Sequence, residues 1–139
     1  MNLFLPFPRA TLLMPSGPPS HPGLRHLFVV MTDPVAQPDT TQLVVLVNIT
    51  SVRPGVTIDA TCRLSPGSHP FIRHDSYVEY RYARLEECNA LLRGVRDGKL
   101  IPHSPMSEPI FARIADGMLR SPHLIPKIRH FYQATLERG

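Results

Sequence analysis

Hydrophobic positions between residues 26 and 64 follow the short runs and two-residue period that are typical of β-strands. The stretch "QLVVLVNIT" (42–50) is apolar on both faces until its end, which predicts a central strand covered on both sides. The run "HLFVVM" (26–31) predicts a strand before it, and "VTIDATCRL" (56–64) predicts a weaker strand after it.

A fourth strand is predicted over "SYVEYRYARL" (76–85), where apolar and polar positions alternate. Val78, Tyr80 and Tyr82 share the face that should pack in the core. Tyr77 lies on the opposite face among charged residues. We therefore expect Tyr80 and Tyr82 to be core residues and Tyr77 to be free to stack on a ligand.

The period changes to that of an α-helix after Leu85. The first predicted helix ends at Gly98, the second is capped by Ser107, and the third opens at Pro126. Strands followed by helices indicate an α+β fold, in which a small, mostly antiparallel β-barrel or sheet is covered by helices.

Residues 1–24 contain six of the sixteen prolines and show no clear period. We expect a Pro-rich N-terminal arm that is disordered or extended, so deleting it should change the melting temperature little. The predicted domain is residues 25–139, a single unit whose C-terminal extension (85–139) is helical.

Charge and cysteine content narrow the class of protein. The chain has 139 residues, a net charge of +4 and a pI near 9.5, which favours an anionic partner such as nucleic acid or an acidic peptide. The two cysteines suggest no disulfide framework, and no apolar run reaches the about 20 residues that a membrane helix needs. We expect a cytoplasmic protein that does not enter a membrane.

The densest group of reactive side chains is "HPFIRHDSYVEYRYARL" (69–85). His69 and His74, with Cys62 and Asp59 upstream, could hold zinc, but the chain lacks a paired C-x-x-C motif, and we predict no metal. The same two histidines could act as acid and base around a phosphodiester, although no spacing rule supports this role.

Asn48 and Thr50 place polar groups on one face at the end of an apolar strand. They fit two interpretations: a strand that frays into a turn, or a hydroxyl that a rigid barrel holds at its mouth. Arg25 precedes the first predicted strand, where a solvated loop arginine is the ordinary interpretation.

The order of three short motifs resembles the MazF/PemK (Kid-like) toxins of type II toxin–antitoxin systems. These motifs are "RHLFVV" (25–30), "VNITS" (47–51) and "HDSYV" (74–78), and the resemblance covers about residues 24–98. It implies an SH3-like barrel that forms a homodimer and cleaves single-stranded RNA without metal or cofactor. His26 stands where the family usually has proline, and residues 1–24 show no counterpart of the family's first strand.

The resemblance also implies which residues form the site. Arg25 and Thr50 match the family's catalytic arginine and threonine; they would stabilise the phosphorane that forms when a ribose 2′-hydroxyl attacks the adjacent phosphate. A cognate antitoxin protein would cover the RNA groove. We expect further RNA contacts from Asn48, Ser51, His69, His74, Ser76 and Tyr77.

A rival interpretation is a non-catalytic barrel of the same type. Such a module would bind a protein target, as CcdB-like gyrase poisons do, or would bind nucleic acid without cleaving it. It needs no Arg25–Thr50 pair.

Overall fold

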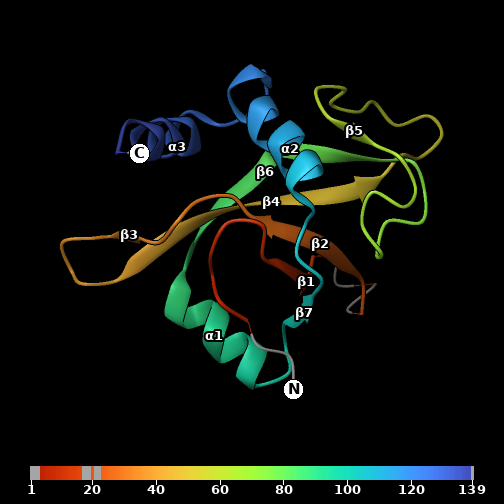
Figure 1. The fold of residues 1–139 in the computed structure, drawn as a ribbon. Coiled ribbons are helices and arrows are strands. Elements are labelled where there is room, and N and C mark those ends of the chain that lie inside the picture. Colours follow the sequence, from red (N-terminus) through yellow and green to blue (C-terminus); the bar gives the residue numbers. More distant parts are fainter. Residues whose placement is uncertain (1–3, 17–19, 21–22, 139) are drawn as a thin grey trace.

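The computed structural model describes residues 4–16, 20 and 23–138, which form one curled antiparallel sheet and three helices (Figure 1). Six strands follow the order β5-β6-β4-β2-β1-β7, and the short β3 pairs with β4. The strands are β1 (Thr11–Pro15), β2 (Arg25–Val30), β3 (Val35–Ala36), β4 (Gln42–Ser51), β5 (Arg63–Leu64), β6 (Ser76–Glu87) and β7 (Ile101–His103). The helices are α1 (Cys88–Arg96), α2 (Glu108–Arg120) and α3 (Pro126–Arg138).

The predicted α+β class is confirmed, with an antiparallel, barrel-like sheet and helices at the C-terminus. The sheet is a half-barrel, because β5 and β7 are the two ends of the strand order and do not pair with each other. Among the described helices, none has a stretch long and apolar enough to cross a bilayer.

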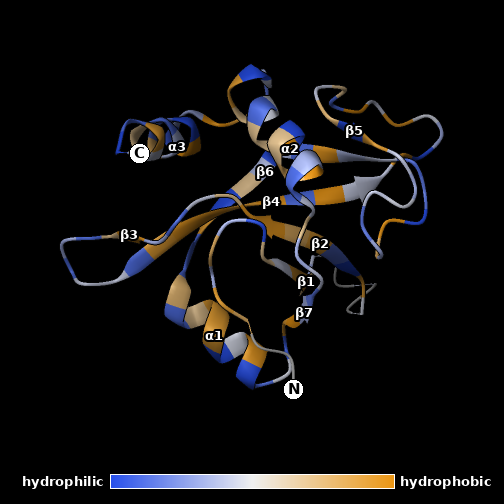
Figure 2. Ribbon diagram, viewed as in Figure 1, coloured by the Kyte–Doolittle hydropathy of each residue, from blue (hydrophilic) through white to orange (hydrophobic). Residues whose placement is uncertain are grey.

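Strand β4 is covered on both faces, as its sequence predicted. Val45, Val47 and Ile49 belong to the larger core cluster, which also contains side chains of α2 and α3. Val44 and Leu46 belong to a second cluster, which contains side chains of α1 and the N-terminal segment. Figures 1 and 2 show α1 on one side of the apolar central strands and α2 on the other. Alternation along one strand therefore supplies two cores.

The N-terminal segment departs from its prediction. Residues 11–15 form β1, an interior strand between β2 and β7, with Leu12 0% exposed. Met14 shares its buried face, and Phe4 packs in the same cluster. The disordered arm was therefore a wrong expectation for residues 4–16. Six proline-free residues separate Pro8 from Pro15, and β1 uses the last four of them together with Pro15. Residues 1–3, 17–19 and 21–22 lie outside the described part of the chain.

A bulge in β6 reverses the prediction that Tyr82 is a core residue. Asn48 pairs with Glu79 and Leu46 pairs with Arg84, so one β4 residue opposes four β6 residues. Strand β6 therefore has three more residues than β4 at this point. Because three is an odd number, the side chains that follow lie on the opposite face from the one predicted. Tyr82, predicted to be a core residue, is 56% exposed.

Tyr80, the first residue of the bulge, is fully buried as predicted, whereas Tyr77 is only 4% exposed and is not free to stack. The Tyr77 hydroxyl donates to the Glu79 carboxylate at 3.2 Å, and Tyr77 lines a small pocket together with Ile58 and His123. Segments from other parts of the chain, which contain Ile58 and His123, therefore cover a face of β6 that the sequence pattern predicts to be exposed to solvent.

Two boundaries also differ from the prediction. Only Arg63–Leu64 of the expected strand 56–64 pairs with β6, and the first helix begins at Cys88 because β6 continues to Glu87. The other helix signals hold: Gly98 follows α1 with a φ of +75°, Ser107 is the N-cap residue of α2, and Pro126 opens α3.

Packing of α2 on the sheet depends on Gly117. The Tyr80 hydroxyl donates to the Ile114 carbonyl at 2.7 Å, and a Cβ at Gly117 would collide with that hydroxyl. We expect Gly117→Ala to lower the free energy of unfolding by about 1–3 kcal/mol through overpacking, despite the better helix propensity of alanine. Urea denaturation measures the change, and Ala112→Gly on the exposed side of α2 calibrates propensity alone. An equally stable Gly117→Ala protein would contradict the close contact.

Candidate functional site

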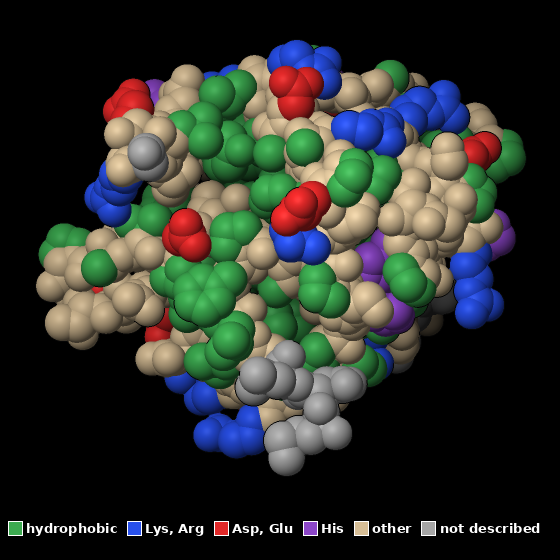
Figure 3. Space-filling model, viewed as in Figure 1, with side chains coloured by type: hydrophobic (Ala, Val, Ile, Leu, Met, Phe, Trp, Pro, Cys, Tyr) green, Lys and Arg blue, Asp and Glu red, His purple; other side chains and the backbone are tan. Residues whose placement is uncertain are grey.

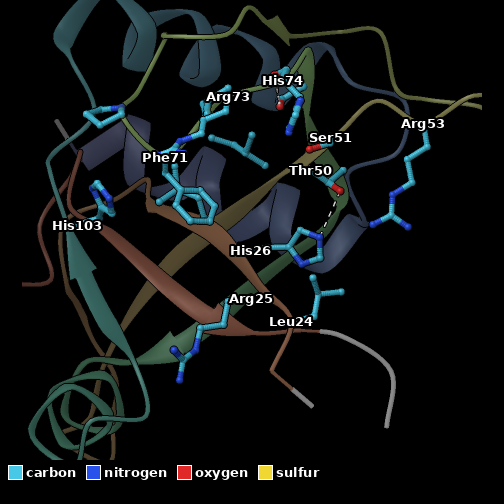
Figure 4. A pocket seen from close by; sticks show the side chains of 15 residues that line it. Leu24, Arg25, His26, Thr50, Ser51, Arg53, Phe71, Arg73, His74 and His103 are labelled. Atoms are coloured by element: carbon cyan, nitrogen blue, oxygen red, sulfur yellow. Dashed lines mark hydrogen bonds between the residues drawn. The ribbon is translucent and has the colours of Figure 1, made fainter. Parts of the chain in front are cut away.

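A pocket of about 470 Å³, here called the rim pocket, opens where β2 begins, β4 ends and β6 begins (Figure 4). The loop over residues 70–74 forms another wall, and His103 at the end of β7 lies at its edge. Antiparallel pairing brings these strand ends together although they are far apart in the sequence.

The rim pocket is cationic. Arg25, Arg53 and Arg73 line it together with three histidines, and no aspartate or glutamate does. Within the described chain, none of these arginines forms an ion pair with a carboxylate, and the buried Nε of Arg25 has no hydrogen-bond partner. Figure 3 shows histidine side chains at the surface on the β5 side of the view, with Lys or Arg side chains nearby. Unpaired guanidinium groups around a hollow are suited to binding an anion.

Arg25 and Thr50 both line the pocket, but they come from opposite faces of the sheet. Leu27 pairs with Ile49, so the side chain of Arg25 shares the core face of these two residues. Thr50 is on the other face, and Figure 4 shows the Arg25 guanidinium pointing away from it. Antiparallel pairing thus joins the two strand ends as expected, without aiming these two side chains at one point.

His26 is the residue that faces Thr50, and its role was missed in the sequence, where it stood only as a departure from the family's proline. The Thr50 hydroxyl lies 3.3 Å from Nε2 of His26, and the Ser16 hydroxyl hydrogen-bonds Nδ1. Alternation places residues 26 and 50 on one face once the register of β2 on β4 is known, but the sequence does not give that register.

The environment of His26 keeps its ring neutral. Burial is the main cause that lowers its pKa below the ordinary 6.5; Glu79 opposes this shift and the positive charge of Arg53 adds to it. At neutral pH the imidazole can therefore accept a proton.

Five of the eight predicted site residues line the rim pocket: Arg25, Thr50, Ser51, His74 and Ser76. The other three do not. Asn48 lines the neighbouring groove, Tyr77 is buried at a different small pocket, and His69 is buried behind the loop.

His69 holds the backbone instead of facing the pocket. Its Nδ1 accepts from the Phe71 N–H at 3.0 Å, and Nε2 therefore carries the proton and donates to the Ser104 carbonyl at 2.6 Å. It is 2% exposed, and burial lowers its pKa. These two bonds tie the loop to the segment after β7, which fixes one wall of the rim pocket.

The zinc set considered in the sequence is not assembled. Cys62 is buried in the larger core cluster, and burial raises the pKa of its thiol, which disfavours the thiolate that binds metal. Across the described ranges, no three His, Cys, Asp or Glu side chains are placed to hold a metal ion.

Arg53, Arg73 and His103 complete the pocket, and sequence reasoning did not single them out. Arg73 lies inside the His-rich stretch and Arg53 in the "RPG" turn, so proximity to Thr50 and His74 was the available signal. His103 had none, because it is more than fifty residues from Thr50 and arrives only through the pairing of β7 with β1.

Comparisons of the chain with protein-family models, with curated proteins and with solved structures gave no match in any of the three.

Proposed function

We propose that the protein is an endoribonuclease that binds single-stranded RNA at the rim pocket and cleaves it without metal, as the toxin of a toxin–antitoxin pair. The observation that carries this proposal is a pocket with three unpaired arginines, three histidines and no carboxylate around Thr50. Strand β1 also supplies a first strand, the element that the family resemblance requires and that the sequence appeared to lack.

RNA cleavage by this route needs three groups from the protein: a base, groups that stabilise the phosphorane, and an acid. A base removes the proton from the ribose 2′-hydroxyl, whose oxygen forms a bond to phosphorus while the bond to the 5′-oxygen breaks. Neutral His26 is suited to accept that proton. Arg53 stabilises the negative phosphorane, and the Thr50 hydroxyl donates to a non-bridging oxygen. Arg25, whose guanidinium points away from Thr50, adds positive charge at the pocket wall.

The departing 5′-oxygen takes a proton from an acid. His74 and His103 line the same pocket and are the candidates for this step. The products are a 2′,3′-cyclic phosphate and a 5′-hydroxyl, so atoms and charges balance with no co-reactant.

The partners belong to the same proposal. An acidic antitoxin would bind over the cationic pocket, and two copies of the chain would form a dimer. Complementary charge makes such a complex sensitive to salt.

A cleavage assay in EDTA tests the proposal. We expect the purified protein to cut a labelled single-stranded RNA, to leave cyclic phosphate ends, and to spare the DNA of the same sequence. The logarithm of RNA affinity should fall with the logarithm of salt with a slope of about −2, since three arginines would meet about three phosphates. RNA binding without cleavage would favour a non-catalytic nucleic-acid module, and no binding would favour a protein target.

A further inference from the structure

A second groove, of about 520 Å³, adjoins the rim pocket, and His26 lines both. Its walls come from β2, β4 and the bulged part of β6, and it is here called the bulge groove. The proposed cleavage chemistry uses none of its other residues. They include a buried amide at Asn48, an exposed ring at Tyr82, and the charged pair Glu79 and Arg81.

Asn48 is a polar side chain without a partner. It is 5% exposed, it lines the bulge groove, and its Oδ1 makes no hydrogen bond. Buried amides are nearly always hydrogen-bonded in folded proteins, so this oxygen is an acceptor that a ligand in the groove can use.

Tyr82 is an aromatic ring that the β6 bulge turns outward. It is 56% exposed, and the Arg81 guanidinium lies 5.2 Å from the ring centroid. An exposed ring beside a cation is the combination on which nucleobases stack in single-stranded nucleic acid sites.

The spacing along β4 links the two sites. Asn48 and Thr50 are two residues apart on the same face, which separates them by roughly 7 Å. This separation is comparable to that between the phosphate and the base of one nucleotide. A phosphate at Thr50 therefore leaves its base within reach of Asn48.

We infer that the bulge groove binds the nucleobase next to the cleaved phosphate, with Tyr82 stacked on it and the Asn48 amide hydrogen-bonded to its edge. Glu79 pairs with Asn48 across the strands and adds a second acceptor. Two acceptors favour a base with an exocyclic amino group over uracil. The inference rests on the proposed RNA-cleaving function and gives it a base preference.

Binding of short 2′-O-methyl RNA, which lacks the attacking hydroxyl, tests the base site separately from RNA cleavage. Oligo-A, oligo-C, oligo-U and an abasic oligomer of the same length serve as probes in fluorescence anisotropy. For the wild type we expect tighter binding of oligo-A and oligo-C than of oligo-U, and the weakest binding of the abasic oligomer.

The variants isolate the ring and the amide. Tyr82→Ala should weaken oligo-A binding roughly 5- to 150-fold, while Tyr82→Phe, which keeps the ring, stays near wild type. Asn48→Ala should reduce the preference for amino-bearing bases about tenfold. Neither change should affect the abasic oligomer. Tyr82 is exposed, so its substitution leaves the fold intact even if Asn48→Ala does not fold.

The experiment distinguishes failure of the base site from failure of the proposed RNA-cleaving function. Wild-type protein that binds all four probes equally, with no effect of Tyr82→Ala, would overturn the base site and leave the RNA function standing. Wild-type protein that binds none of them would overturn both.

Discussion

Deletion of residues 1–16 is expected to abolish cooperative folding. The deletion removes β1 from between β2 and β7, so both neighbours lose a partner and expose unpaired backbone groups. It also removes Leu12 and Met14 from the second core cluster, and the Arg9 guanidinium and Thr11 hydroxyl from the carbonyls of the segment after β7. Far-UV circular dichroism and urea denaturation would show the loss.

A single substitution gives a graded version of the same test. Leu12→Ala should cost about 2–5 kcal/mol of the free energy of unfolding, because the side chain is 0% exposed and leaves a cavity. Leu5→Ala is the matched control, since Leu5 is 51% exposed and should change stability by no more than about 0.5 kcal/mol. A truncated chain that melts at the wild-type temperature would show that β1 is not an integral strand.

The largest expected effect on activity is that of His26→Ala. If His26 accepts the 2′-hydroxyl proton, its loss should reduce kcat for RNA cleavage by about 10²–10⁴. Arg25→Ala should cost less than about 10², because its guanidinium points away from Thr50 and adds only longer-range positive charge. Thr50→Ala should also cost less than His26→Ala, because a hydroxyl gives a neutral hydrogen bond. Single-turnover cleavage measures all three.

The pH profile distinguishes a base from a structural group. A general base acts in its deprotonated form, and burial lowers the pKa of His26, so the acidic limb of kcat/KM should lie below pH 6.5 and disappear in His26→Ala. His130→Ala and Arg93→Ala, both exposed and outside the rim pocket, are controls for charge. Full activity of His26→Ala, with the acidic limb unchanged, would assign the base to another residue.

The sequence was informative where one local signal dominated. Strands β2, β4 and β6 and the three helices could be predicted, because runs such as "QLVVLVNIT" satisfy the period of their element and are bounded by turn or cap residues. Five of the eight site residues named from the sequence line the rim pocket, because this pocket lies at the ends of those strands.

Prediction failed where distant pairing decides the outcome. The prolines on either side of residues 11–14 led to the prediction of a disordered or extended arm. These residues form β1 because they pair with β2 and with β7, which is distant in the sequence. The β6 bulge exchanged the faces of later residues, which exposed Tyr82. His26 gained meaning only opposite Thr50, and His69 lost its predicted role because both ring nitrogens bind the backbone.

The sequence by itself determined the order and type of most elements, the doubly covered β4, and the positive charge, because these follow from local periodicity and composition. Only the tertiary structure decided the register between strands, and with it which side chains meet. A step of one residue in register moves every side chain to the other face of a sheet, and no local pattern fixes that step. The rim pocket and the bulge groove exist because β2, β4 and β6 pair in this register.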